Sequence, residues 1–222
     1  MGKNWVQNYF QVCSLIFANI QKNMTPERRE KLLRVLSKRQ SNLTVVMENV
    51  QDPHNISAVM RTCDAVGIQD IYILNTKIPR HDKFGVKSSS SALKWLTINQ
   101  FDNNEACFRA LRKNYQTILT THLSSDAIGL YEIDFTKSVA LVFGNEHSGV
   151  TDAVRALADG NFIIPQMGII QSLNISVACA VSIYEASRQK TNAGHYNQIS
   201  LPNERMEVLM GEWGFEETAN DE

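Results

Sequence analysis

The sequence predicts an α/β fold in which a mainly parallel sheet is covered by helices on both faces. Short apolar runs rich in β-branched residues alternate along the chain with longer segments of helical periodicity, which is the order of βαβ units. Polar side chains follow several of the apolar runs. These are the points where parallel strands end and where open sheets bind their ligands.

The expected elements follow from these patterns in order. Thr25 and Pro26 are typical of a helix start, and they open an amphipathic segment at 26–40. Apolar runs predict strands at 43–48, 71–74, 95–98, 117–121, 139–143 and 162–164. Helical spacing predicts helices at 56–66, 105–113, 151–158 and 173–188, and Gly67 ends the first of these four.

Two further segments give weaker signals. The polar stretch 76–91, which contains Pro79, Gly85 and a run of serines, predicts a surface loop. The stretch 206–215 has the composition of a short helix, but its apolar pattern is too short to establish helical periodicity.

Composition bounds the architecture. With 222 residues, of which 43% are hydrophobic, the chain can bury one sizeable core. We expect a helical N-terminal extension at 1–42, a main domain at 43–196 and an acidic C-terminal tail or helix at 197–222. No apolar run approaches the ~20 residues that span a bilayer, and polar residues interrupt the apolar segment 10–20, so we expect a cytoplasmic protein without a signal peptide.

The cysteines and histidines form no recognised metal site. The four cysteines are far apart and include no Cys-x-x-Cys pair, which argues against a zinc site and against a disulfide scaffold. Cys63 and Cys179 are expected to pack in the core. His54, His122 and His147 each lie beside a polar segment of interest, but without a metal-ligand spacing, so no metal is expected.

Charge is unevenly distributed. The net charge of −1 by itself predicts no nucleic-acid partner. However, the segment 26–40 carries basic residues near one helical face and leucines on another, whereas the chain from residue 203 onward is strongly acidic. The basic face suits a phosphate-binding helix. It also suits a solvated helix face, and the pattern alone favours this second interpretation.

Three segments carry the candidate site. The first is 163–189, where a strand ends at Pro165, Gly168 lets the backbone approach a ligand, and Ser172 is placed to cap a long helix. An ordinary strand-to-helix turn would have the same pattern. The segments 55–67 and 141–149 also place polar side chains after apolar runs, so the three together favour a ligand site read by backbone groups.

These segments resemble the motifs of a known family. Asn55 with Arg61, then Gly144-Asn145-Glu146, then Pro165 through Ser172-Leu173-Asn174 resemble, in order and spacing, the SpoU branch of the SPOUT RNA methyltransferases. The resemblance covers about 25–196 and is strongest to the TrmH-type subgroup, on the segments 25–29, 61–67, 121–123 and 188–194. Two departures are Gln166 with Met167, where apolar residues are expected, and the extra residues 1–24.

The resemblance implies an activity and a fold. TrmH-type enzymes transfer a methyl group from S-adenosyl-L-methionine to the ribose 2′-hydroxyl of a tRNA guanosine, at position 18 in the D-loop. They form a deep C-terminal trefoil knot, which sequence rules would not propose, and they act as homodimers whose sites are completed by the partner chain. The cofactor contacts that the resemblance implies are Thr121, His122, Leu123, Gly144, Asn145, Ile164, Met167, Ser172 and Leu173.

The resemblance also implies the catalytic residues. Arg61 would stabilise the developing alkoxide and grip a phosphate, since a guanidinium remains protonated in proteins. Glu146 would hold Arg61 or the ribose, and Asn55 would orient Arg61 or the 2′-hydroxyl. Ser172 and Asn174 would support the loop or a phosphate. The plainer alternatives are that Asn55 and Ser172 only cap helices and that Glu146 only forms an ion pair.

The expected RNA contacts are basic residues of the N-terminal helix and of the long C-terminal one: Arg28, Arg29, Lys31, Arg34, Lys38, Arg39, Arg188 and Lys190. Two other functions stay open. One is 2′-O-methylation of ribosomal RNA or of another tRNA site, and the other is a catalytically silent RNA-binding relative. A nucleotide-binding protein with an ordinary open sheet is disfavoured, because no Gly-x-Gly-x-x-Gly or P-loop fingerprint follows a strand.

Overall fold

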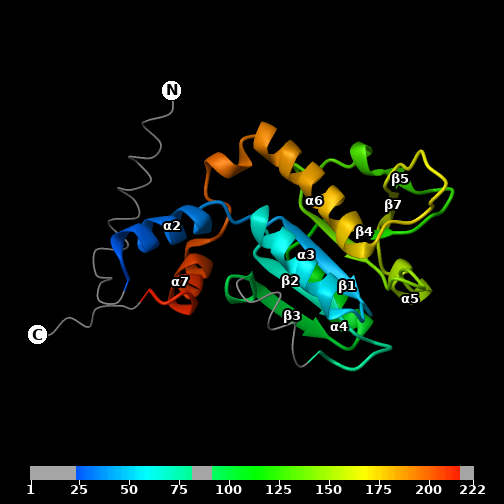
Figure 1. Cartoon of the computed structure of the whole chain (residues 1–222), viewed down its shortest axis with the longest axis horizontal. Helices are drawn as coiled ribbons and strands as arrows, with labels where there is room; N and C mark the ends of the chain where they lie inside the picture. The colour runs from blue at the N-terminus through cyan, green and yellow to red at the C-terminus, as the bar shows by residue number, and fades with distance from the viewer. Residues whose placement is uncertain (1–23, 82–91, 216–222) are drawn as a thin grey trace, which may run out of the picture. The chain divides into compact units, whose positions relative to one another are not determined.

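Seven strands form one parallel sheet in the order β3-β2-β1-β6-β4-β7-β5 (Figure 1). The structure is a computed structural model that describes residues 24–81 and 92–215. The strands are β1 (Leu43–Glu48), β2 (Asp70–Leu74), β3 (Thr97–Phe101), β4 (Thr117–Thr121), β5 (Ile128–Gly129), β6 (Val139–Phe143) and β7 (Gly160–Ile163). The parallel sheet confirms the predicted α/β class.

Helices connect the strands and cover both faces of the sheet. The α-helices are α2 (Pro26–Leu36), α3 (Pro53–Ala65), α4 (Asn104–Arg112), α5 (Asp152–Arg155), α6 (Ile175–Asn192) and α7 (Asn203–Glu212). Short 3₁₀ helices lie at η1 (Ala92–Lys94), η2 (Leu130–Glu132) and η3 (His195–Asn197). Within the described part of the chain, no helix is both long and apolar enough to cross a membrane.

Two apolar cores lie on opposite faces of the sheet. Leu43, Val45 and Met47 of β1 pack in the core that contains the apolar residues of α3 and α6, whereas Val46 packs with Cys107 of α4 on the other face. This alternation follows the two-residue period of a strand. Because β1 has neighbours on both sides and helices over both faces, all six of its residues are buried.

Several predicted bounds differ from the structure. The helix predicted at 26–40 ends at Leu36, so Lys38 and Arg39 follow it instead of extending its basic face. The strand predicted at 95–98 lies at 97–101, because the preceding residues form η1. α3 starts earlier than expected, where the Asp52 side chain caps the helix by accepting a 2.8 Å hydrogen bond from the His54 amide.

The chain divides into two compact units. One contains residues 37–201 and therefore the whole sheet, and the other contains residues 1–36 and 202–222, with α2 and α7 among its described elements. The two ends of the larger unit lie together. The Ser41 backbone amide donates to Ser200 Oγ at 3.1 Å, and Ser41 Oγ donates to the Ser200 carbonyl at 2.9 Å.

Lys190 near the end of α6 is fully buried, so the expectation that it contacts a phosphate of the RNA is wrong. Its Nζ donates to Asn42 Oδ1 at 2.7 Å. Burial lowers the pKa of Lys190 from its ordinary value of 10.5 to about 8, and exposed Asp134 only partly opposes this effect. Between these two values the unfolded chain binds more protons than the folded chain, so this group makes the protein more stable as pH rises from about 8 to 10.5.

We therefore expect replacement of Lys190 by methionine to flatten the pH dependence of stability. From pH 7.5 to pH 10 the free energy of unfolding of the native chain should rise, relative to Lys190→Met, by about 2 kcal/mol. The measurement is urea unfolding of both proteins at the two pH values. Other titrating groups cancel in the comparison, so parallel pH profiles would contradict the assignment.

Candidate functional site

The three motif segments meet in one chain of hydrogen bonds. Asn55, in the first turn of α3, donates from Nδ2 to Glu146 Oε1 at 2.9 Å, and its Oδ1 accepts from Asn174 Nδ2 at 3.1 Å. Asn55 therefore joins the loop after β6 to the start of α6. Residues separated by more than ninety positions along the sequence are brought together here.

Asn174 has a second role as the cap of α6. Its Oδ1 accepts hydrogen bonds from the Ser176 amide at 2.8 Å and from Ser176 Oγ at 2.6 Å. The prediction that Ser172 caps this helix is wrong, because α6 starts at Ile175. Ser172 is exposed and makes no hydrogen bond to any residue that the structure describes. Its hydroxyl is thus available to a ligand.

The loop after β6 is tightly folded around Asn145. The Asn145 amide donates to the Gly149 carbonyl at 3.1 Å, the Gly149 amide donates back at 2.9 Å, and Asn145 Oδ1 accepts from the His147 amide at 2.9 Å. A Cβ at Gly144 would lie 2.1 Å from the Gly149 backbone, so no side chain fits there. Both the backbone and the side chain of Asn145 are thus used to hold the shape of the loop.

A pocket of about 600 Å³ lies at the carboxyl ends of β4, β6 and β7. This is the edge of a parallel sheet at which ligands bind. Its lining includes nearly all of the expected cofactor contacts, namely Thr121, His122, Leu123, Gly144, Asn145, Ile164, Ser172 and Leu173. Met167 is not among the lining residues, and its side chain is 96% exposed.

Other lining residues were not predicted as site residues from the sequence. His147, Gln166 and Gln171 contribute polar groups, and Phe143, Phe162 and Ile170 contribute apolar walls. The only sequence signal for them is that they flank the motif residues. The resulting pocket combines apolar walls with a few polar groups, which is typical of sites for small organic ligands.

Arg61 lies apart from this pocket. It is exposed on α3, lines no part of the pocket and has no hydrogen-bond or ion-pair partner among the described residues. Its position, six residues after Asn55, turns its side chain by roughly 240° and shifts it by about 9 Å along the helix. Within the described chain Glu146 binds Asn55 and not Arg61.

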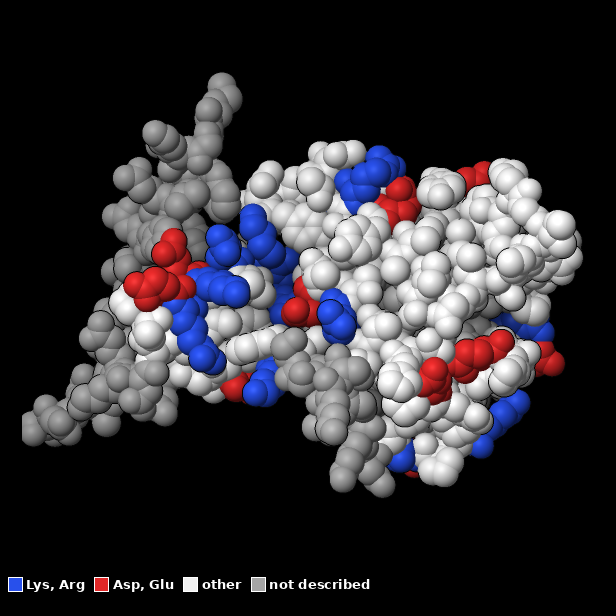
Figure 2. All heavy atoms as spheres, viewed as in Figure 1, with Lys and Arg blue, Asp and Glu red and all other residues white. Residues whose placement is uncertain are grey.

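The expected RNA-contacting residues fall into two groups. Arg28, Lys31 and Arg34 are exposed on α2, and Arg29 is half-buried. Figure 2 shows Lys and Arg side chains gathered on this helix. Arg188 on α6 is exposed, but it donates two 2.8 Å hydrogen bonds to the carboxylate of Glu185, which lowers the pKa of that carboxyl group. Its charge is therefore already partly compensated.

Arg39 does not belong to this set. Its side chain is fully buried and pairs with Asp64 at 2.6 Å, and it also donates to the carbonyls of Ile68 and Trp95 at 3.1 and 3.2 Å. A guanidinium without exposed surface cannot contact a phosphate, so the sequence prediction for Arg39 is wrong. Half-buried Lys38 donates from Nζ to the Tyr196 carbonyl, which ties it to the main unit.

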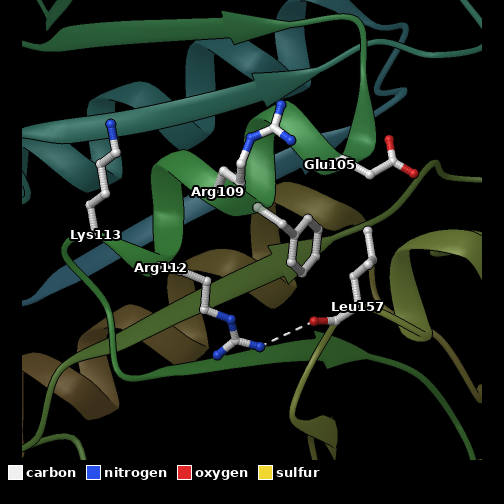
Figure 3. A pocket seen from close by; sticks show the side chains of 6 residues that line it. Glu105, Arg109, Arg112, Lys113 and Leu157 are labelled. Carbon is white, nitrogen blue, oxygen red and sulfur yellow. Dashed lines mark hydrogen bonds between the residues drawn. The ribbon is translucent and has the colours of Figure 1, made fainter.

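A second hollow lies on α4 (Figure 3). Its rim carries Glu105, Arg109 and Lys113, and Arg112 donates to the Leu157 carbonyl at 3.1 Å. Arg112 also pairs with Asp159 at 2.5 Å. None of the three motif segments reaches this hollow. Within residues 24–81 and 92–215, no cluster of three or more His, Cys, Asp or Glu side chains could hold a metal ion.

The model of the SpoU rRNA Methylase family matches residues 42–184, which includes the motif residues from Asn55 to Asn174. The chain belongs to the SpoU methylase family. This membership confirms the resemblance inferred from the three motifs.

Its relatives within the SpoU methylase family include tRNA-modifying enzymes. The tRNA (guanosine(18)-2′-O)-methyltransferase of Thermus thermophilus is 39% identical over 191 residues, which cover 85% of this chain and 96% of that enzyme. The enzyme of the same name from Escherichia coli K12 is 37% identical, with coverage of 86% and 84%. The Aquifex aeolicus TrmH/SpoU tRNA modifying enzyme has a solved structure with a TM-score of 0.77 at 37% identity, covering 84% of this chain and 95% of that one.

Proposed function

We propose that this protein transfers the methyl group of S-adenosyl-L-methionine to the ribose 2′-hydroxyl of guanosine 18 in the D-loop of tRNA. The observation that carries the proposal is the Asn55–Glu146–Asn174 chain of hydrogen bonds, which brings the family's three motifs together beside the pocket. Relatives that match this chain over most of their length are named for this reaction.

The pocket suits the cofactor. Leu123, Phe143 and Ile170 offer apolar surface to an adenine ring, and the loops that contain Gly144 and Gly168 bring backbone groups to the lining. A Cβ at Gly168 would meet nothing within 4 Å, so space remains beside this segment. When bound, S-adenosyl-L-methionine supplies a methyl group on an electrophilic sulfonium. We propose that these loops belong to the trefoil knot of the SPOUT fold.

The residues of the chain then position the ribose oxygen and stabilise charge. Arg61 donates hydrogen bonds to the oxygen as negative charge develops on it and to the adjacent phosphate, since its guanidinium cannot act as a base. Glu146 is fixed through Oε1 by Asn55, which leaves Oε2 to accept a hydrogen bond from the substrate. Ser172 presents a hydroxyl to the same pocket.

The protein is proposed to act as a homodimer. Met167, Ile169 and Ile170 have exposed fractions of 96%, 100% and 70%, and Val177 and Tyr184, seven residues apart on one face of α6, are also exposed. Exposed apolar groups of this kind are typical of an interface. A second copy would cover them, and it would also supply Arg61 to a pocket that the chain's own Arg61 does not line.

Replacing Val177 and Tyr184 with glutamate should therefore convert the dimer to a monomer and abolish methyl transfer, because two charges would be buried without partners. Light scattering after size exclusion measures the assembly. Val208→Glu, at a similarly exposed valine on α7, is the matched control. A double variant that remains dimeric would place the interface elsewhere.

The test of the proposed function is methyl transfer from labelled cofactor to unmodified tRNA, with the product nucleoside mapped. We expect 2′-O-methylguanosine at position 18, and no transfer to a tRNA whose guanosine 18 is replaced by its 2′-deoxy form. Labelling at another tRNA site would keep the chemistry and change the specificity. Cofactor binding without transfer to any RNA would favour a silent RNA-binding protein.

Ribosomal RNA is the second candidate substrate. A 23S rRNA (guanosine-2′-O-)-methyltransferase of Xanthomonas campestris is 34% identical over 152 residues. However, the match covers only 60% of that enzyme, whereas the matches to the tRNA-modifying enzymes of Thermus thermophilus and Escherichia coli cover 96% and 84% of theirs. Labelling of ribosomal RNA alone in the same assay would decide for this alternative.

A further inference from the structure

Glu48 at the end of β1 is a buried carboxylate held by neutral donors. It has no exposed surface, and it forms no ion pair with the residues that the structure describes. Its Oε2 accepts from the Thr151 amide at 3.0 Å, and its Oε1 accepts from Thr151 Oγ1 at 2.6 Å. Burial of a carboxylate costs free energy unless hydrogen bonds satisfy its oxygens, and the two bonds from Thr151 do so.

Thr151 ends the loop 144–151, and the next residue after Glu48, Asn49, binds the start of that loop. Its φ of +50° is in the left-handed region, which asparagine tolerates better than most residues. In this conformation its carbonyl accepts from Asn145 Nδ2 at 2.8 Å. Its Oδ1 accepts from the amides of Thr76 and Lys77 at 2.9 and 2.8 Å. These side-chain bonds stabilise an otherwise unfavourable backbone conformation.

Together the two residues hold both ends of the loop 144–151. Asn49 binds the loop at Asn145, just after β6, and Glu48 binds it at Thr151, just before α5. The strands explain this placement, because β1 and β6 are neighbours and Met47 lies in register with Phe143. Between the two anchors stands Glu146, whose carboxylate accepts the hydrogen bond from Asn55.

We propose that Glu48 and Asn49 are positioning residues for methyl transfer. Neither residue lines the pocket, but the loop that they hold supplies Gly144, Asn145, Glu146, His147 and Gly149 to it. Without its two anchors this loop would move relative to α3, and Glu146 would lose its fixed distance to Asn55. The proposal rests on the proposed function, since it assigns these residues to the same site.

Thr151 offers the mildest test. Thr151→Val removes the hydroxyl that binds Glu48 but keeps the side-chain shape, whereas Thr151→Ser keeps the hydroxyl. Thr44→Val is the matched control: Thr44 is fully buried at the other end of β1, and its Oγ1 donates to the Asp70 carbonyl at 2.6 Å. Both valine variants remove a hydroxyl that donates a 2.6 Å hydrogen bond, and the Thr151 hydroxyl also caps α5 by accepting from the Val154 amide at 3.4 Å. Thr44 lies about 13 Å along the strand from Glu48.

The measurements are cofactor affinity by calorimetry, kcat and KM for tRNA, and melting temperature. We expect Thr151→Val to reduce kcat about tenfold and to weaken cofactor binding, with KM for tRNA unchanged, because a hydrogen bond to a charged group is lost. Thr151→Ser should restore both values. Thr44→Val should lower the melting temperature comparably and leave kcat and cofactor affinity unchanged.

Three outcomes would overturn the proposal. One is native kcat and cofactor affinity in Thr151→Val, and another is equal loss of these in Thr44→Val, which would mean that stability alone is responsible. The third is a failure of serine at position 151 to restore them. A native protein that binds the cofactor but methylates no RNA would refute the proposed function instead, and cofactor affinity would still report on the loop.

Discussion

Arg61→Ala is expected to reduce methyl transfer by about 10²–10³-fold while leaving cofactor affinity and melting temperature unchanged, because it removes a donor that acts as charge develops on the ribose oxygen. The structure predicts no other effect of this substitution on folding or on cofactor binding. Arg61 is exposed and bonds to no described residue, and it does not line the cofactor pocket. The measurement is single-turnover methylation of tRNA together with calorimetric titration of S-adenosyl-L-methionine.

Arg109→Ala is the matched control, since Arg109 is an exposed arginine on α4 outside the motif segments. It should leave the methylation rate unchanged. Arg61→Lys should recover only part of the activity, because lysine keeps the charge but not the planar set of donors. A rate for Arg61→Ala within a few-fold of the native value would remove Arg61 from the mechanism.

The proposed homodimer allows a test of which subunit supplies Arg61, with mixed dimers of two variant chains. Arg61→Ala and Asn174→Ala chains should each be inactive alone, since the second loses the cap of α6 and its bond to Asn55. If Arg61 acts across the interface, a dimer of one chain of each kind contains one complete site and recovers up to about half of the activity per dimer. If Arg61 acts within its own chain, both sites carry a defect and the mixture stays inactive.

Reversing the charge of α2 is the second change with a large expected effect. Replacing Arg28, Lys31 and Arg34 with glutamate should weaken tRNA binding by about 100-fold or more, because phosphate contacts supply much of the affinity for a nucleic acid. All three side chains are exposed, whereas Arg29 is half-buried and is left unchanged. Gel-shift titrations over a range of salt concentrations measure both the affinity and its salt dependence.

The control places the same charge change elsewhere. Lys94, Arg109 and Lys113 are exposed residues of the main unit, and their replacement with glutamate should have a smaller effect on binding. Cofactor affinity should be native in both triple variants. Equal loss of RNA binding in the two proteins would mean that overall charge, and not α2, attracts the substrate.

The sequence predicted the central strands well, because burial on both faces leaves a simple apolar signature. The predicted bounds of β1, β4 and β6 agree with the structure, and each strand lies between neighbours on both sides. β5 was missed, since a strand of two residues carries no periodic pattern. The order of the strands depends on packing between distant segments, which no local pattern contains.

Helix ends were predicted less well, for local reasons. Ser172 and Asn174 are both good cap residues, and the choice between them depends on the bond from Asn174 to Asn55, which comes from another segment. The sequence pattern placed Arg39 on the basic face of a helix over 26–40. In the structure α2 ends at Leu36, and Arg39 turns inward to pair with Asp64. A charged residue that is neutralised inside the protein looks the same in sequence as one on the surface.

The candidate site was likewise predicted in part. Residue types and their order indicated the three segments and most of the pocket lining. Which side chains bind one another was open, and the structure pairs Glu146 with Asn55. The sequence did not indicate a role for Glu48 or Thr151, because a carboxylate at the end of an apolar strand and a threonine before a helix are both ordinary features.

The division of the chain has a consequence for its synthesis. The unit that contains α2 is built from both ends of the polypeptide, and residues 37–201 lie between its two parts. On the ribosome, α2 therefore emerges long before α7, and at ordinary translation rates the delay is about ten seconds or more. During that time Leu32, Leu33 and Leu36 lack the segment that completes their unit. The sheet can form first, and the helix proposed to bind RNA reaches its final state only after α7 has been synthesised.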